Sequence, residues 1–447
     1  MHRILLCAMA LAMAMPAAQA QESLPQMRQE LKQLQQRIEE LEGRVKDAES
    51  TATQAAAQAS SRPQSENALN PGVSVILNGV YANLSRDPKT YRLNGFVPTM
   101  QDVAPPTRGF SLGESEVAFM ANIDHMFRGT LIGSISPDND TIGVEEGYIQ
   151  TIGLSHGFTL KAGRFFSAIG YQNQIHAHAW DFTDAPLAMR VFLGGQLNED
   201  GIQFRWVAPT PLYWDMGTEL GRGRAFPASL SDSGKNGARS LNFFTHVGGD
   251  IGESIAWQTG LSHFRTSPSG RQFATTDALG NAITDSFTGT SRLWVASGIL
   301  KWSPNGNPTY NNLKLQGEYF RRKEEGSLVF DSAGAALANG LSSRQSGWYA
   351  QGVYQFMPLW RAGYRYDRLD SGTVNIDTAA SGLTAADFPI LAGYKPKKHS
   401  VMVDWSPSEF SRIRLQYARD YSRIGEPDNQ VFLQYIVSLG AHGAHTF

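Results

Sequence analysis

Cysteine and net charge are both scarce in this sequence. Its one cysteine is Cys7, so the rest of the chain is expected to form no disulfide bond. The formal charge of −2 over 447 residues argues against a nucleic-acid-binding protein, which needs a basic face. Long apolar runs are missing beyond the first 20 residues, and this absence excludes a helical membrane protein.

The first 20 residues have the three parts of a secretory signal. Arg3 precedes an apolar core over residues 4–16, and Ala18, Gln19 and Ala20 form a small-x-small cleavage site. The apolar core is too short to span a bilayer, which argues against the alternative of an N-terminal membrane anchor. We expect residues 1–20 to be a signal peptide, removed together with Cys7 on export.

Residues 21–50 contain apolar residues at alternating spacings of three and four. These residues are Leu24, Met27, Leu31, Leu34, Ile38, Leu41, Val45 and Ala48. The heptad pattern predicts a parallel, self-associating coiled coil, and the alternative is an amphipathic helix that packs on its own domain. Residues 51–71 are rich in Ala, Gln and Ser without an apolar period, and we expect them to form a flexible linker.

Beyond Pro71 the apolar residues recur with a period of two. Val117, Phe119, Ala121 and Ile123, for example, alternate with residues that are mostly polar or small. One apolar face and one polar face are typical of a sheet with lipid outside and water inside. A soluble β-sandwich is the alternative, and the connections between the strands decide against it.

Short turns and longer loops alternate along the chain. The short turns lie near residues 124–125, 155–157, 208–211, 250–253, 303–308, 356–358 and 406–408. The longer connections are 86–110, 137–141, 166–200, 223–238, 266–288, 324–344, 370–395 and 423–428. This alternation predicts an all-β fold over residues 72–447, a 16-stranded antiparallel transmembrane β-barrel with periplasmic turns and extracellular loops. Fourteen or eighteen strands remain possible because strand limits are uncertain by a few residues.

The last strand alternates in the same way, and the chain stops on Phe447. This end resembles the closing strand of Gram-negative outer-membrane proteins, in which a terminal aromatic residue is the assembly signal. The barrel region resembles the sixteen-stranded porins, and the heptads resemble the periplasmic coiled coil of sucrose-type porins. Segments 70–79, 160–166, 176–181 and 440–445 resemble a proteobacterial family described as zinc-regulated outer-membrane receptors of the TonB-dependent kind. These resemblances imply an outer-membrane location, a coiled coil in the periplasm, a trimer and a link to zinc.

The connection over residues 166–200 is unusually long for a compact domain. We predict that it is a third outer loop that folds into the bore and narrows it. His176 and His178 project to one side of an extended chain, and with Asp181 and Asp184 they suit a weak, transient zinc site. The alternative is that these are ordinary polar residues held to the barrel wall by hydrogen bonds. His442 and His445 are expected at the periplasmic rim, and no permanent cofactor is expected.

Charged residues on the polar faces of the strands are expected to line the pore, because a charge facing lipid costs roughly 2–4 kcal/mol. The predicted lining residues are Glu114, Glu116, Arg205, Asp215, Glu219, Arg361, Arg365, Arg412 and Arg414. Opposed acidic and basic walls would screen solutes by charge.

The predicted function is that of an outer-membrane porin for small hydrophilic solutes, with zinc or its complexes among the candidates. The expected partners are these solutes, membrane lipid and further copies of the chain, and nucleic acid is not among them. A TonB-dependent zinc or metallophore receptor is the alternative, but residues 51–71 are too few for its plug and the barrel is too short for about 22 strands. A structural role is a further alternative. No Gly-x-Ser-x-Gly, His-Glu-x-x-His or phosphate-binding loop is present, and His246 has no nucleophile near it in sequence, so no enzyme is expected.

Overall fold

The computed structural model describes residues 29, 32, 72–99, 103–135, 141–229 and 236–440. The chain divides into two units, Met1–Asn70 and Pro71–Phe447. In the first unit the structure describes only Gln29 and Lys32, both in helical conformation. The expected signal peptide, coiled coil and linker therefore lie outside the described residues, as do His442 and His445. No helix in the described part of the chain has the length and apolar character needed to cross a membrane.

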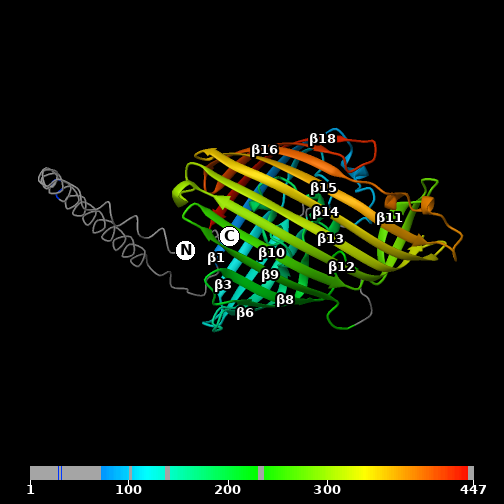
Figure 1. Ribbon diagram of the computed structural model, residues 1–447. Coiled ribbons are helices and arrows are strands. Elements are labelled where there is room, and N and C mark those ends of the chain that lie inside the picture. The colour runs from blue at the N-terminus through cyan, green and yellow to red at the C-terminus, as the bar shows by residue number, and fades with distance from the viewer. Residues whose placement is uncertain are drawn as a thin grey trace, which may run out of the picture. The chain divides into compact units, whose positions relative to one another are not determined.

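The second unit contains a closed antiparallel β-barrel (Figure 1). Its first strand, β1 (Gly72–Leu84), pairs with its last, β18 (Asp428–Gly440), so that Ser74 lies opposite Gly440. Closure leaves no strand edge with unpaired backbone groups, and the lipid interior tolerates none.

Two strands of the barrel are interrupted, so 18 strand segments make up sixteen strands. β2 (Gly109–Leu112) and β3 (Ser115–Asn122) both pair with β1. In the same way, β10 (Ile255–Thr266) and β11 (Arg271–Thr276) both pair with β12 (Ala282–Trp302). The predicted 16-stranded antiparallel barrel is confirmed.

The strands differ greatly in length. The remaining ones are β4 (Phe127–Ile135), β5 (Ile142–Thr151), β6 (Phe158–Phe166), β7 (Asn198–Val207), β8 (Tyr213–Gly221), β9 (Ser240–Ile251), β13 (Asn312–Phe330), β14 (Leu337–Met357), β15 (Trp360–Asp377), β16 (Lys397–Ser408) and β17 (Ser411–Asp420). β12 and β14 have 21 residues each, about twice the 9–11 that a bilayer requires. These long strands continue beyond the membrane on the side of the longer connections.

The expected loop limits at 266–288 and 324–344 are therefore wrong. Strand pairing continues through both segments, and Glu325, for example, lies opposite Ser342. Above the bilayer a sheet can face water on both sides, so polar residues there do not mark the end of a strand.

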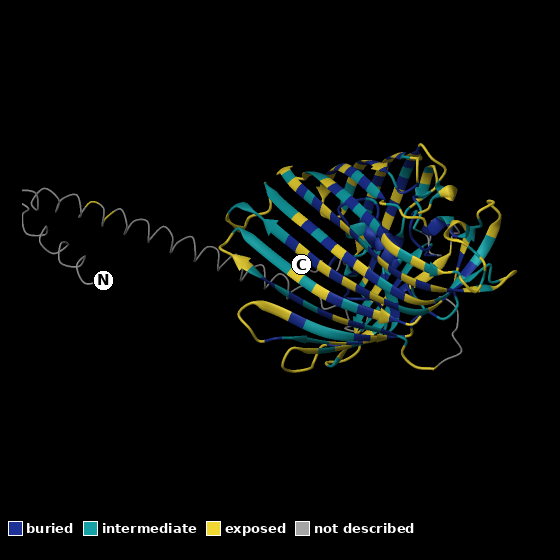
Figure 2. Cartoon of the chain, turned by 45° about the vertical axis from the view of Figure 1, so that its right-hand side comes forward, coloured by how far each residue is buried: buried dark blue, intermediate teal, exposed yellow. Residues whose placement is uncertain are grey.

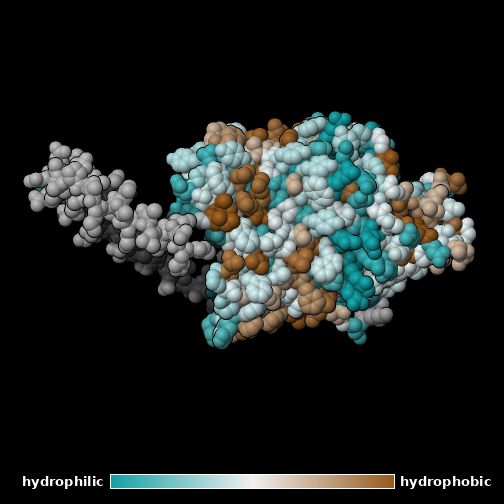
Figure 3. All heavy atoms as spheres, viewed as in Figure 1, coloured by the Kyte–Doolittle hydropathy of each residue, from teal (hydrophilic) through white to brown (hydrophobic). Residues whose placement is uncertain are grey.

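The outer face of the barrel is apolar over much of its surface. Leu131, Leu415 and Tyr435 are 47%, 55% and 50% exposed, and each alternates with inward-facing neighbours. Figure 2 shows this alternation along the strands, and Figure 3 shows apolar side chains grouped on the wall. This face suits contact with lipid.

The connection between β6 and β7, residues 167–197, is called the inner loop below because its residues are bonded to side chains of the barrel interior. It contains the short helices η2 (Gln172–Gln174) and η3 (Ala177–Ala179), and the α-helix α2 (Leu187–Leu193). Pro186 precedes α2, and Gly194 ends it with φ of 70°, a left-handed conformation that glycine adopts without strain.

All seven residues of α2 are buried. The helix belongs to the largest apolar cluster of the barrel, which includes Phe320, Tyr349 and Leu369 of β13, β14 and β15. The Phe192 ring stacks on the Phe320 ring at a centroid distance of 5.9 Å. Part of the bore is therefore filled by a packed apolar core.

Candidate functional site

Wall carboxylates hold the backbone of the inner loop. The Glu219 carboxylate accepts hydrogen bonds from Ser167 Oγ at 2.5 Å and from the Ala168 amide at 2.8 Å. Asp367 accepts one from the Leu187 amide at 2.9 Å, where α2 begins. The bonds from the Ala168 and Leu187 amides satisfy backbone donors that burial in the bore removes from water.

One side of the inner loop contacts a basic wall. The Asp184 carboxylate lies 2.7 Å from Lys398 Nζ, 3.1 Å from Arg365 Nη2 and 2.8 Å from Arg190 Nη2. Burial by itself would raise the pKa of Asp184, but Lys398, Arg365 and Arg190 outweigh it and hold this pKa well below the ordinary value. Asp184 therefore stays ionised as the centre of a buried ion cluster.

Asp181 extends the same basic contact toward the short turns. Its carboxylate lies 2.6 Å from Lys314 Nζ and 3.1 Å from Arg361 Nη1. Burial raises the pKa of Asp181, and these two cations, with Arg414, reverse the effect and lower the pKa.

The other side of the inner loop contacts an acidic wall. His178 Nδ1 lies 2.8 Å from Glu116 Oε1 on β3, and His176 Nδ1 lies 3.2 Å from the second oxygen of the same carboxylate. His176 Nε2 lies 3.0 Å from Glu146 on β5, and its Nδ1 lies 3.6 Å from Glu145. Burial opposes protonation of His176, but the nearby carboxylates of Glu116, Glu145 and Glu146 outweigh burial and raise the pKa of His176 well above its ordinary value.

The predicted lining residues face the interior, and most of them contact the inner loop or one another. Arg365 and Arg414 are 1% and 0% exposed, and Arg414 donates a hydrogen bond to the Trp180 carbonyl at 2.7 Å. Glu116, Asp215 and Glu219 are also buried, and Glu114, Arg205, Arg361 and Arg412 are half-buried. The buried lining residues contact the inner loop or form pairs with other side chains of the wall. The half-buried lining residues lie nearer to water.

The four predicted metal ligands are divided between the two walls. His176 and His178 lie together, with ring centroids 5.7 Å apart, whereas Asp181 and Asp184 are bonded to basic side chains. Ligand atoms of Glu116, His176 and His178 lie within 4.8 Å of one another, and so do those of Glu114, Glu116 and Glu145.

The sequence argument missed Glu145 and Glu146. Strict alternation would turn one of two successive glutamates toward lipid, yet both are buried, at 8% and 7% exposure. A β-bulge explains this, because Ile132 pairs with Glu146 and Gly133 with Val144, which leaves Glu145 as an extra residue. The sequence did contain a signal for this bulge. Two adjacent glutamates in a lipid-facing strand cannot both face the interior unless the regular alternation is interrupted.

Cavities lie above and beside the inner loop. The outer cavity, of 740 Å³, is lined by residues of the long connections, including Leu93, Thr275 and Ile390. The side cavity, of 440 Å³, lies between the inner loop and the wall formed by β18, β1, β4, β5 and residues 113–114, which precede β3. Val103 and Ala104 line both cavities, so the two adjoin.

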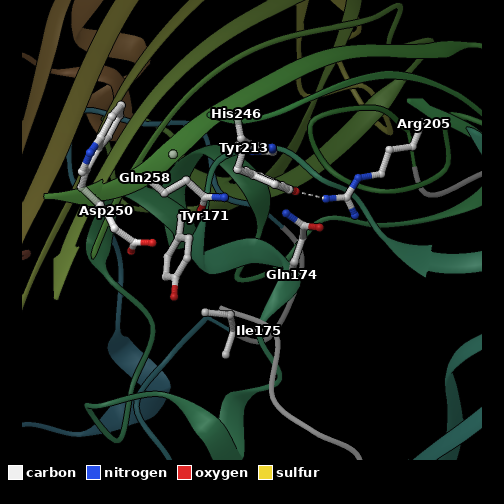
Figure 4. A pocket seen from close by; sticks show the side chains of 11 residues that line it. Tyr171, Gln174, Ile175, Arg205, Tyr213, His246, Asp250 and Gln258 are labelled. Atoms are coloured by element: carbon white, nitrogen blue, oxygen red, sulfur yellow. Dashed lines mark hydrogen bonds between the residues drawn. The ribbon is translucent and has the colours of Figure 1, made fainter. Parts of the chain in front are cut away.

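A third cavity, the turn-side cavity, has 490 Å³ and lies beside the first part of the inner loop (Figure 4). Tyr171 and Gln174 of the loop face Asp250 and Gln258 of β9 and β10 across it. Tyr213 accepts a hydrogen bond of 2.6 Å from Arg205 at its rim.

His246, also at this cavity, is bonded to Asp215 at 2.9 Å. A His–carboxylate pair of this kind belongs to many hydrolytic sites. Its other ring nitrogen, Nε2, lies 3.3 Å from the Gly170 carbonyl oxygen, which is not a nucleophile.

No protein-family model matches the chain. An uncharacterized protein of Aquifex aeolicus is 28% identical over 417 residues, which cover 86% of this chain and 81% of that protein. Two structures of OmpT, an outer membrane protein of Vibrio cholerae, are similar in fold, each covering 83% of this chain and 99% of its own. The loop L8 deletion mutant has a TM-score of 0.51 at 10% identity, and the trimer form has 0.52 at 11%. The likeness shows the fold of a porin-like outer-membrane barrel.

Proposed function

We propose that the barrel is an outer-membrane porin through which small hydrophilic solutes diffuse past the inner loop. The observation that carries this proposal is the side cavity of 440 Å³, which adjoins the outer cavity at Val103 and Ala104. A solute entering from outside would pass the inner loop on the side of β1, β4 and β5, because the opposite side is filled by α2 and its apolar partners.

The lining of the side cavity supports a preference for cations. Glu114 and Glu145 line it from the wall, and Asp184 and Arg190 line it from the loop. Asp184 and Arg190 are paired with each other, so any net charge in the cavity comes from the neighbouring carboxyl groups of Glu114 and Glu145, which share a hydrogen bond. Rings of acidic side chains select cations in channels.

Recordings of the purified protein in planar bilayers test the proposal. We expect stepwise conductance with a preference for potassium over chloride, and a reduced preference in the double variant Glu114→Gln with Glu145→Gln. The matched control is Glu253→Gln, at an exposed short turn, with unchanged selectivity. A barrel that inserts but passes no current contradicts the porin and favours an energy-coupled receptor or a structural protein.

Finer parts of the proposal have their own support. A homotrimer is supported by the trimer form of OmpT. Passage of zinc or its complexes is supported by the imidazoles and carboxylates beside the side cavity. A coiled coil over residues 21–50 would lie in the periplasm, since the chain enters the barrel at the end of the short turns.

A further inference from the structure

The cluster of His176, His178 and four glutamates gathers four carboxyl groups around two imidazoles. Its glutamates are Glu114, Glu116, Glu145 and Glu146. Among the described residues, no Lys or Arg forms an ion pair with these glutamates. Carboxyl groups that are buried close together repel one another when they ionise, and a bound metal ion removes that repulsion.

Two atoms in this cluster are buried without a hydrogen bond. They are His176 Nδ1 and Glu145 Oε2, which lie 3.6 Å apart. Glu145 is 8% exposed, and its free oxygen points at the imidazole. An imidazole nitrogen and a carboxylate oxygen that face each other without a hydrogen bond are donors that a metal ion accepts.

The other nitrogen of His176 completes the pattern of a metal-binding histidine. His176 Nε2 is bonded to Glu146 at 3.0 Å. Histidines that bind metals commonly donate their second N–H to a carboxylate, which orients the ring and raises its basicity.

We propose that Glu116, His176 and His178, with Glu145, bind one divalent transition-metal ion that fastens the inner loop to β3 and β5. Imidazole nitrogens with carboxylate oxygens are the donors that zinc accepts in tetrahedral sites. The ligand atoms of Glu116, His176 and His178 lie within 4.8 Å of one another, and Glu145 Oε2 lies 3.6 Å from His176 Nδ1, so the four groups must move closer to form bonds of about 2.0–2.2 Å. Glu145 also lines the side cavity, which gives the ion a route to the site.

Equilibrium dialysis of the folded, untagged protein with Zn²⁺ tests this site without reference to transport. The background should be His442→Ala with His445→Ala, which removes the imidazoles of the terminal segment. We expect one ion per chain, and an affinity that falls about 10–100-fold in Glu146→Gln and further in His176→Gln. The matched control is His246→Gln, a buried histidine bonded to one carboxylate, which should keep the affinity.

A shift of the visible spectrum of bound Co²⁺ in His178→Gln would identify the imidazole as a ligand. Absence of Zn²⁺ binding in the folded background protein overturns the proposal, and so does equal binding by His176→Gln. Heat-dependent migration in gels confirms that each barrel is folded. If His176→Gln fails to fold, the Zn²⁺ affinity of Glu146→Gln tests the site instead, because this substitution leaves all proposed ligands in place.

An independent observation lies on the outer face of β10, β12, β13 and β14. Arg265 lies opposite Arg292, Arg292 opposite Lys323, and Lys323 opposite Arg344. These four residues are called the basic row. Like charges directly opposite each other destabilise a sheet. Among the described residues, one carboxylate, that of Glu325, forms an ion pair with the row, at 2.6 Å from Lys323 Nζ.

The basic row lies next to the lipid-facing surface. Trp294 and Tyr319 are 48% and 46% exposed. Both lie nearer to the short turns than the basic row does, on β12 and β13. Hydrophilic side chains gather on this face toward the end that carries β11 (Figure 3). Aromatic residues mark the edge of a bilayer, so the row lies at headgroup level in the outer leaflet.

We infer that the basic row binds the phosphate groups of an anionic lipid of the outer leaflet. Native mass spectrometry with added lipid A, and with phosphatidylcholine as the neutral lipid, tests this. The double variant Arg292→Gln with Arg344→Gln should retain lipid A at least several-fold less well, with no change for phosphatidylcholine. The control is Arg222→Gln, an exposed arginine with an acidic neighbour, Asp200. Equal retention by the double variant and the wild type overturns the inference.

Discussion

Lys398 Nζ lies 2.7 Å from a carboxylate oxygen of Asp184, although 214 residues separate the two in the chain. Lys398 belongs to β16, and Asp184 belongs to the inner loop. Their side chains are 0% and 6% exposed, and Arg365 and Arg190 share the same carboxylate. The position of the inner loop therefore depends on a buried charge cluster.

Replacing Asp184 by Asn should destabilise the barrel strongly. The substitution leaves Lys398, Arg365 and Arg190 buried without their common carboxylate, and loss of one partner of a buried pair costs about 3–5 kcal/mol. Urea titration of the refolding barrel measures the free energy of unfolding. The matched control is Asp200→Asn, whose pair with Arg164 has side chains 37% and 41% exposed, and it should cost less than about 1 kcal/mol. Equal losses in the two variants would contradict the cluster.

Replacing Phe192 by Ala should release the inner loop within an intact barrel. Phe192 is fully buried, stacks on Phe320 and meets the Phe96 ring edge-on at 5.9 Å. Truncation of a buried Phe costs about 3–5 kcal/mol. Trypsin cleavage after Arg190 reports loop opening and should accelerate about a hundredfold or more. Leu279→Ala, at a position 88% exposed, should leave the rate unchanged, and an unaltered rate in Phe192→Ala would refute the packing.

The contribution of Asp184 to stability should depend on pH only in strong acid. Its pKa in the folded protein is held below the ordinary value of about 3.9, so its contribution is complete above that pH. The contribution is lost as the pH falls through the folded-state pKa. The difference in unfolding free energy between wild type and Asp184→Asn should therefore be constant from pH about 7 to about 4 and shrink below. A difference that shrinks already near neutral pH would show that another group controls the loop.

The strand count could be predicted because it depends on local signals. Turns rich in Pro, Gly, Ser and Asp separate segments with a period of two, and each boundary can be read without knowing its partner strand. The extent of β13 and β14 could not be predicted in this way, because Glu325 and Ser342 pair in a sheet that continues above the bilayer.

The interior was harder to predict for a different physical reason. A charged residue on the inward face of a strand gives the same sequence pattern whether it faces water or a docked loop. The burial of Arg365 and Arg414 could not be predicted because it depends on contacts between distant parts of the chain. The apolar residues of α2 likewise acquire their partners on β13 to β15 only when the loop folds inward. The bulge at Glu145 is invisible to a period-two rule, and it places a carboxylate beside His176.

Modification of a single cysteine in the side cavity tests the solute path most directly. In a chain produced without residues 1–20, and so without Cys7, Ser134→Cys introduces a unique thiol where β4 lines this cavity. A path through the side cavity predicts that a cationic methanethiosulfonate reagent lowers the single-channel current of Ser134→Cys in discrete steps. The same reagent should leave Leu131→Cys unchanged, since Leu131 lies on the same strand and faces outward. An unaltered current in Ser134→Cys, with modification verified by mass, would contradict the path.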